Sequence, residues 1–210
     1  MKTMAIAVRV SAVLRTALLV AFSVLVLAPF TSEALASGNP TPPDNGAAGL
    51  CEREIQSAAA KYGIPEGILY SVGLTETGRK GSLYPYALNV EGRPIFPPSE
   101  GAALQVFAAA RQSGAKLIDV GCMQINQYFH GENFTSVDAM FDPRSNVEYA
   151  AKFLRNLHDR HETWTMAVAR YHAGPNNDPA QKVYVCRVIA NLVATGYGKW
   201  TPNAATFCQN

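Results

Sequence analysis

A single glutamate, Glu76, occupies a costly position in the segment SVGLTETGRKG (residues 71–81). It lies in the last turn of an expected helix and four residues after Val72, so it falls on the apolar stripe that faces the core. The end of a helix carries partial negative charge, which favours the protonated form of a carboxyl group placed there. A carboxyl that keeps its proton near neutral pH can act as a general acid. The alternative is a solvated glutamate that pairs with Arg79 or Lys80.

The elements that would position Glu76 are mostly helical. Apolar residues at helical spacing, combined with capping residues, predict helices that begin near Cys51, Pro65, Ser99, Asp142, Thr163 and Asp178. Two β-prone runs in YALNVEGRPIF (86–96) flank Glu91-Gly92 and predict a hairpin, and AKLIDVG (115–121) is another strand candidate. The expected fold class is therefore α+β, mostly α-helical, with a small antiparallel β-sheet.

The first 36 residues have the pattern of a signal peptide for export. Lys2, Arg9 and Arg15 form a positive segment, the apolar run 17–28 follows, and the small residues of 34–36 predict cleavage after Ala36. The alternative is an uncleaved anchor, but a membrane span needs about 20 apolar residues. Residues 37–50 are rich in proline, glycine and asparagine and are expected to form a flexible linker.

The charge of the mature chain excludes some functions. Cleavage removes three basic residues and one acidic residue and leaves 15 of each, so the chain is formally neutral. Nucleic-acid binding depends on lysine and arginine contacts to phosphate, and a neutral chain argues against it. It also argues against attachment to a membrane surface by charge, and no membrane span is expected after cleavage.

Export places the four cysteines in an oxidising compartment, where an even number predicts two disulfides rather than metal ligands. Four cysteines allow three connectivities. We favour Cys51–Cys122 and Cys186–Cys208, because the first pair ties the first helix to a later strand and the second pins the C-terminal tail, residues 197–210. The alternative is that Cys122 and Cys186 are buried free thiols.

Three further segments follow Glu76-Thr77 along the chain: GCMQIN (121–126), ARYHAGP (169–175) and YVCRV (184–188). Together they resemble, in order, the catalytic Glu-Ser, the Gly-Leu-Met-Gln, the Ala-Tyr-Asn-Ala-Gly-Pro and the late tyrosine motifs of the soluble-lytic-transglycosylase (SLT) domain. FDPRSNVEYAAKFL (141–154) resembles the family's helix between the second and third motifs. The resemblance covers roughly residues 51–195 and implies a lysozyme-like catalytic domain, which we place at 51–196.

The resemblance implies a peptidoglycan lytic transglycosylase that cleaves the MurNAc-β-1,4-GlcNAc bond and leaves a 1,6-anhydroMurNAc end. Glu76 would be the sole catalytic acid and base, and neither a metal nor an organic cofactor is implied. The residues expected to bind the glycan strand or orient the acid are Thr77, Gln124, Asn126, Tyr171, His172 and Tyr184. The protein would act after export, in the periplasm or as a secreted enzyme.

The chain departs from the family pattern at three positions. Thr77 replaces serine but keeps a hydroxyl, Cys122 replaces leucine, and His172 replaces asparagine. The last two changes resemble the branch of the family that serves secretion and conjugation machineries. That likeness implies local opening or remodelling of the cell wall, with an envelope-spanning secretion or flagellar apparatus as a partner.

Two other functions remain open at this point. A hydrolytic lysozyme of goose type would use water in place of the sugar hydroxyl, with Asp119 as its nearest candidate base. A non-catalytic peptidoglycan-binding assembly protein would use the same groove, but a binding module has no use for a destabilising acid at position 76.

Several aromatic and histidine side chains have ordinary explanations. His158 and His161 have a spacing that metal ligands can use, but no third ligand is evident, and they fit the polar face of a helix. Trp164 and Phe153 fall on apolar faces and are expected in the core. Three aromatic residues in non-helical stretches are expected to form the walls of a saccharide groove: Tyr84, Tyr86 and Tyr128.

Overall fold

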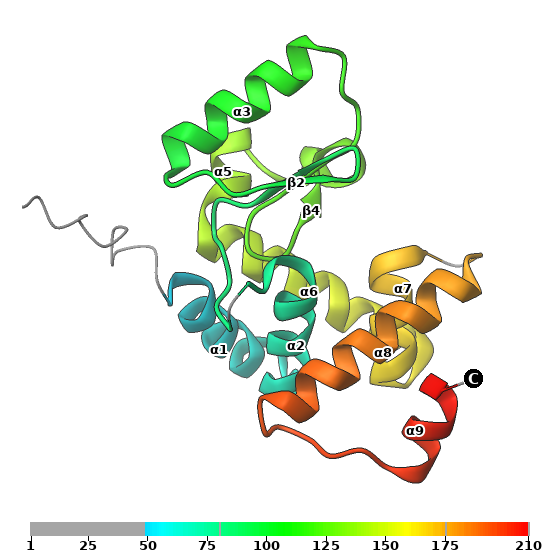
Figure 1. Ribbon diagram of the computed structural model, residues 1–210. Helices are drawn as coiled ribbons and strands as arrows, with labels where there is room; N and C mark the ends of the chain where they lie inside the picture. Colours follow the sequence, from blue (N-terminus) through cyan, green and yellow to red (C-terminus); the bar gives the residue numbers. More distant parts are fainter. Residues whose placement is uncertain (1–48, 80, 175, 210) are drawn as a thin grey trace, which may run out of the picture. The chain divides into compact units, whose positions relative to one another are not determined.

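The computed structural model describes residues 49–79, 81–174 and 176–209 (Figure 1). The expected signal peptide, 1–36, and residues 37–48 of the expected linker lie outside the described residues. The helices are α1 (Leu50–Tyr62), α2 (Glu66–Thr77), α3 (Glu100–Gln112), α4 (Gln127–His130), α5 (Val137–Phe141), α6 (Pro143–His161), α7 (Trp164–Ala173), α8 (Asp178–Ala194) and α9 (Pro202–Gln209), with a 3₁₀ turn, η1, at Gly131–Asn133. The strands are β1 (Leu88–Val90), β2 (Arg93–Ile95), β3 (Ile118–Val120) and β4 (Ile125–Asn126).

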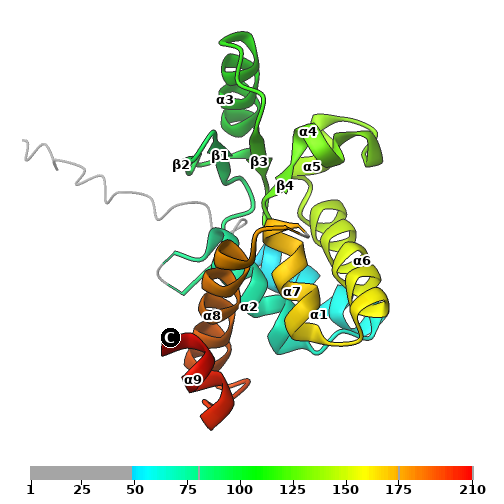
Figure 2. The ribbon, with the colours of Figure 1, turned by 90° about the vertical axis from the view of Figure 1, so that its right-hand side faces the viewer.

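Five helices pack around a common apolar core. Helix α1 packs against α2 and α6, α7 packs against α6 and α8, and α2 also packs against α8 (Figures 1 and 2). The apolar stripe of α6 enters this core through Val147, Ala150 and Leu154, which are fully buried. Because α2 is held between α1 and α8, the end of α2 that carries Glu76 has a fixed position in the fold.

The sheet is small and antiparallel, with strand order β2-β1-β3-β4. Glu91 and Gly92 form the turn between β1 and β2, and both have positive φ, at 49° and 88°. Positive φ at two consecutive turn residues is the requirement of a tight hairpin whose twist matches its strands. Together with the helices, this sheet confirms the predicted α+β class.

The predicted helices are all present, and their caps explain where several begin. The side chains of Ser99, Asp142 and Thr163 accept hydrogen bonds from backbone N–H groups three residues later. Helix α8 is capped by Asn177. Within the described residues, no helix has the length and apolar character needed to cross a bilayer.

Some elements differ from the sequence-based expectation. Helix α1 begins at Leu50, inside the range expected as linker, and the expected tail contains α9. The short elements β4, α4 and α5 were not predicted at all, and Tyr128, expected in a non-helical stretch, lies in α4. These elements span two to five residues, too few to show a hydrophobic period.

The cysteines form two disulfides within the described residues. Cys51 of α1 is bonded to Cys122, in the turn between β3 and β4, with a Cα–Cα distance of 5.7 Å. Cys186 of α8 is bonded to Cys208 of α9, with a Cα–Cα distance of 5.6 Å. This is the connectivity that the sequence analysis favours, and no described cysteine is free. The first disulfide joins the helical core to the turn that carries Gln124.

Candidate functional site

Glu76 faces a cleft of about 280 Å³ between the helical core and the sheet. Its side chain is partly buried, while Val72, one turn earlier on α2, is fully buried. The cleft is lined by Glu76, Asn89, Asp119, Gln124, Ile125, Asn126, Phe129, His130, Phe153, Tyr171 and His172. Glu76 and Asp119 are the two carboxyl groups in this lining.

Burial is the main electrostatic influence on Glu76. It raises the pKa of this carboxyl from 4.5 to about 7, and the nearby negative charge of Asp119 acts in the same direction. A hydrogen bond from Tyr184 opposes the rise, because it stabilises the charged form. The sequence analysis attributed the raised pKa to the helix end and the apolar stripe; the structure assigns it first to burial.

Glu76 does not form the surface ion pair that the sequence left open. No described residue makes a salt bridge with it, and the exposed Arg79 lies over the Phe96 ring, 5.1 Å from its centroid. Lys80 lies outside the described residues. The carboxyl group is therefore directed into the cleft rather than to a cation among the described residues.

Tyr184 holds Glu76 directly. Its hydroxyl donates a hydrogen bond to Oε1 of Glu76 at 2.5 Å, and the tyrosine is 3% exposed on α8. The ring of His172, from α7, stacks on the Tyr184 ring with centroids 4.2 Å apart and planes 3° from parallel. Tyr184 thus orients the Glu76 carboxyl by direct contact, and His172 supports this orientation by packing on Tyr184.

Replacing Tyr184 by phenylalanine should raise the pKa of Glu76 above its value of about 7. The hydroxyl donates to the carboxylate, and a hydrogen bond to a charged group is worth about 1.5–3 kcal/mol, or roughly 1–2 pKa units. NMR titration of labelled glutamate carboxyls measures this pKa. Tyr171→Phe is the matched control, because the Tyr171 hydroxyl donates elsewhere. An unchanged or lower pKa in Tyr184→Phe would show that the contact does not stabilise the carboxylate.

Gln124 reaches the cleft from the turn between β3 and β4. Its Nε2 donates to the backbone carbonyls of Ala87 and Gly121, both at 3.1 Å. Because both amide hydrogens are used, Gln124 can offer a ligand only its amide oxygen. Its φ of 46° is unusual for a residue other than glycine, so the turn has to be held by its surroundings.

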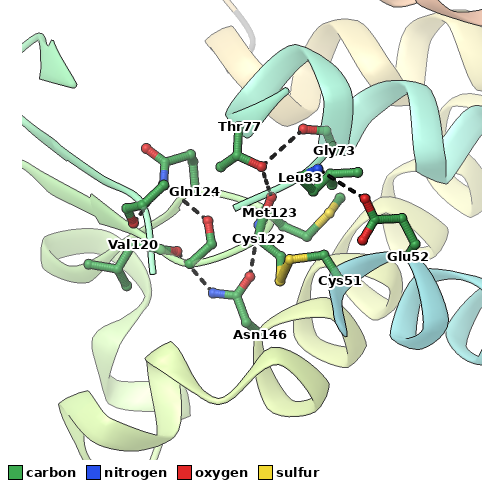
Figure 3. Close-up of a disulfide and its surroundings, with 12 residues drawn as sticks. Cys51, Glu52, Gly73, Thr77, Leu83, Val120, Cys122, Met123, Gln124 and Asn146 are labelled. Atoms are coloured by element: carbon green, nitrogen blue, oxygen red, sulfur yellow. Dashed lines mark hydrogen bonds between the residues drawn. A yellow bond between two sulfur atoms is a disulfide. The ribbon is translucent and has the colours of Figure 1, made fainter. Parts of the chain in front are cut away.

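Asn146 of α6 holds this turn from below, as Figure 3 shows. The residue is fully buried; its Oδ1 accepts from the Met123 N–H at 2.9 Å, and its Nδ2 donates to the carbonyls of Val120 and Met140. Gly121 has φ of 80°, and a Cβ at this position would collide with the Asn146 amide. The sequence analysis did not single out Asn146, because its role depends on contacts far along the chain.

Thr77 corrects one prediction. It was expected to bind substrate, but it is 2% exposed and is absent from the cleft lining. Its hydroxyl donates to the Cys122 carbonyl at 3.0 Å (Figure 3). A residue next to Glu76 on a helix points about 100° away from it, which directs Thr77 into the core. Thr77 therefore links α2 to the Gln124 turn and does not face the cleft.

Tyr171 and Asn126, two further predicted residues, line the cleft, whereas Tyr184 reaches it only through its contact with Glu76. Tyr171 lies there with its hydroxyl donating to the Met123 carbonyl at 2.9 Å, so this phenol also supports the Gln124 turn. The Nδ2 of Asn126 donates to Asp119 at 2.7 Å, and its Oδ1 accepts from backbone N–H groups at the start of α4. Burial raises the pKa of Asp119, while the bond from Asn126 lowers it.

The aromatic wall of the cleft differs from the expectation. Tyr84, Tyr86 and Tyr128 do not line it; Phe129, His130 and Phe153 do. Phe153, expected in the core, is partly buried on α6 and packs against Tyr171, with the two ring centroids 5.7 Å apart. Phe129 and His130 lie three and four residues after the end of the GCMQIN segment, and that proximity was the signal available in the sequence.

The described residues hold no metal site. No group of three or more His, Cys, Asp or Glu side chains in this part of the chain is placed to bind a metal ion. His158 stacks on Trp164 with ring centroids 3.9 Å apart, and His161 is exposed at the end of α6. The spacing of these histidines therefore reflects helix packing and a solvated surface.

Comparison with known proteins identifies one family. The family model described as "Transglycosylase SLT domain" matches residues 53–187, which contain every residue of the cleft lining. Comparisons with curated proteins and with solved structures give no match.

Proposed function

Because the chain belongs to the transglycosylase SLT domain family, whose members are typically lytic transglycosylases acting on peptidoglycan outside the cytoplasm, we propose that it is such an enzyme, with Glu76 as its sole acid and base. The bond cleaved is MurNAc-β-1,4-GlcNAc, and the product ends in 1,6-anhydroMurNAc. The observation that carries the proposal is a buried carboxyl with a pKa of about 7 that faces a cleft and accepts a hydrogen bond from Tyr184.

Glu76 acts twice in this mechanism. Its protonated form donates the proton to the glycosidic oxygen as the bond to C1 of MurNAc breaks, and the 2-acetamido group of the same sugar supports the cationic carbon. The resulting carboxylate then takes the proton of the C6 hydroxyl, whose oxygen bonds to C1 and closes the anhydro ring. A pKa near the working pH suits a group that must give and take a proton. No water is consumed.

The surrounding residues favour both steps. Tyr184 stabilises the carboxylate that forms after the first transfer, while burial and Asp119 keep the starting acid protonated. The amide oxygen of Gln124 is available to accept the N–H of the acetamido group, since both its own hydrogens are bound to backbone. The rings of Phe129 and Phe153 give the sugars apolar faces to pack against.

Asp119→Asn separates this proposal from a hydrolytic lysozyme. Asp119 lines the cleft and is the carboxylate that a hydrolase would use as its base. A transglycosylase that depends on Glu76 alone should retain activity in this variant and give the same anhydro product, because an asparagine can still accept the bond from Asn126. The pKa of Glu76 should fall, since a neighbouring negative charge is removed.

The test is digestion of purified peptidoglycan by both proteins, followed by chromatography and mass spectrometry of the muropeptides. Loss of cleavage in a folded Asp119→Asn protein, with hydrolysed ends from the wild type, would favour the lysozyme. A non-catalytic binding protein would release no muropeptides from either preparation, and the raised pKa of Glu76 would then have no use.

We also propose that the chain is exported by its signal peptide, which is cleaved after Ala36, and that the enzyme opens the wall locally for an envelope-spanning secretion, conjugation or flagellar apparatus. The support is the departure from the family pattern at Cys122 and His172. Cys122 is bonded to α1, and His172 stacks on the tyrosine that contacts Glu76.

A further inference from the structure

A second hollow lies beside the catalytic cleft and is not used by the mechanism above. It has a volume of about 490 Å³ and is lined by residues from the end of α7 to the middle of α8, which lie side by side in Figure 2. His172 lines both hollows, and Tyr184 lines the second while its hydroxyl contacts Glu76. His172 is therefore common to both hollows, which makes them neighbours.

The second hollow contains a cation, Arg187, that has no partner among the described residues. Arg187 is exposed on α8 and forms no salt bridge or hydrogen bond with a described residue. Arg187 and His172 line the same hollow. Burial lowers the pKa of His172, and the charge of Arg187 lowers it further. None of the described residues that line this hollow is acidic, and Val183, Pro179 and Ala180 give it an apolar side.

The catalytic cleft has the opposite character. Its described lining contains two carboxyl groups, Glu76 and Asp119, and neither a lysine nor an arginine. Burial lowers the pKa of His130 and of His172, which keeps both rings neutral near pH 7. An anionic part of a substrate would thus be disfavoured near Glu76 and favoured beside Arg187.

We propose that the second hollow binds the peptide stem attached to the lactyl group of the glycan strand, with Arg187 pairing with a stem carboxylate. In a strand that keeps its stems, the glycan backbone is uncharged because each lactyl carboxyl group is bound in the amide to a stem. The stem carries free carboxylates and small methyl-bearing residues that match the apolar side of the hollow. This inference rests on the proposed function, because it assigns a second part of the same substrate to the same enzyme. Arg187 makes peptide-bearing strands better ligands than bare ones.

The experiment measures binding by a variant that does not turn over, Glu76→Gln, with and without Arg187→Ala. The ligands are soluble peptidoglycan tetrasaccharides in three forms: with free stem carboxylates, with those carboxylates amidated, and with the stems removed and the lactyl carboxyl groups that this exposes capped as amides. Dissociation constants come from titration calorimetry at low salt. The matched control is Arg160→Ala, since Arg160 is an exposed arginine of α6 that lines neither hollow.

The Glu76→Gln protein should bind the free-carboxylate form roughly two- to fivefold more tightly than the other two forms, because one exposed ion pair contributes an effect of this size. Adding Arg187→Ala should remove that difference, and adding Arg160→Ala should keep it. Equal binding of all three forms, or a difference that survives Arg187→Ala, overturns the inference. If the wild type cleaves none of the three forms while this preference persists, the proposed function fails and the stem site stands.

Discussion

Replacement of Glu76 by glutamine is expected to abolish the release of muropeptides from purified peptidoglycan. A single proton-transfer group is typically worth about 10²–10⁴ in rate, and the loss should exceed this because one residue serves both transfers. Glutamine keeps the shape of the side chain and can still accept the Tyr184 hydrogen bond through its amide oxygen. Binding to the glycan strand should therefore persist while turnover is lost.

The same variant has a stability signature that shows whether it is folded. The pKa of Glu76 is about 7 in the folded chain, compared with 4.5 for an ordinary glutamate, the value expected in the unfolded chain. Between these two pH values the folded chain binds more protons than the unfolded chain, so the folded chain loses stability as pH rises from 4.5 to 7. Above pH 7 the penalty approaches about 3 kcal/mol, and glutamine removes it. Glu76→Gln should melt at a higher temperature than wild type at pH 8 and at the same temperature at pH 4. Unchanged digestion by this folded protein would refute the assignment of Glu76.

Replacement of Asn146 by alanine should cause the largest loss of stability among single substitutions near the cleft. It leaves the Met123 N–H and the Met140 carbonyl buried without this side-chain partner, and it removes the side-chain bond to the Val120 carbonyl, which is also part of the β3–β4 ladder. Each buried unsatisfied group costs about 1–3 kcal/mol, so the free energy of unfolding should fall by roughly 3 kcal/mol or more. Denaturant-induced unfolding measures the change.

Asn156→Ala is the matched control for this loss, because Asn156 is an exposed residue of the same helix. Its free energy of unfolding should stay within about 0.5 kcal/mol of wild type. A comparable effect of the two substitutions would mean that Asn146 does not hold the Gln124 turn. Catalysis should fall with Asn146→Ala as well, because Gln124 needs a backbone conformation that this amide supports.

The sequence was most informative where local chemistry decides the structure. Ser99, Asp142 and Thr163 marked helix starts because a cap needs only its own side chain and the next turn. Glu91-Gly92 marked the hairpin because few residue pairs accept positive φ twice in succession. The position of Glu76 followed from its spacing to Val72, four residues along the same helix face.

The sequence was least informative where the contacts are long-range. Thr77 follows Glu76, and the sequence alone did not show that its hydroxyl turns toward the Cys122 carbonyl, 45 residues away in the chain. Asn146 contacts β3 and the Gln124 turn across more than 20 residues, and an asparagine in a helix carries no mark of such a role. The aromatic wall was misassigned because the face of α6 that carries Phe153 borders both the core and the cleft.

The most direct test of the central claim, cleavage without water, is digestion of peptidoglycan in water labelled with heavy oxygen. In the proposed reaction the C6 hydroxyl of MurNAc supplies the oxygen that bonds to C1. Mass spectrometry should therefore find new ends that are lighter than hydrolysed ends by one water and that contain no heavy oxygen. New MurNAc ends that carry the heavy oxygen as the main product would contradict the account and assign the chain to the hydrolases.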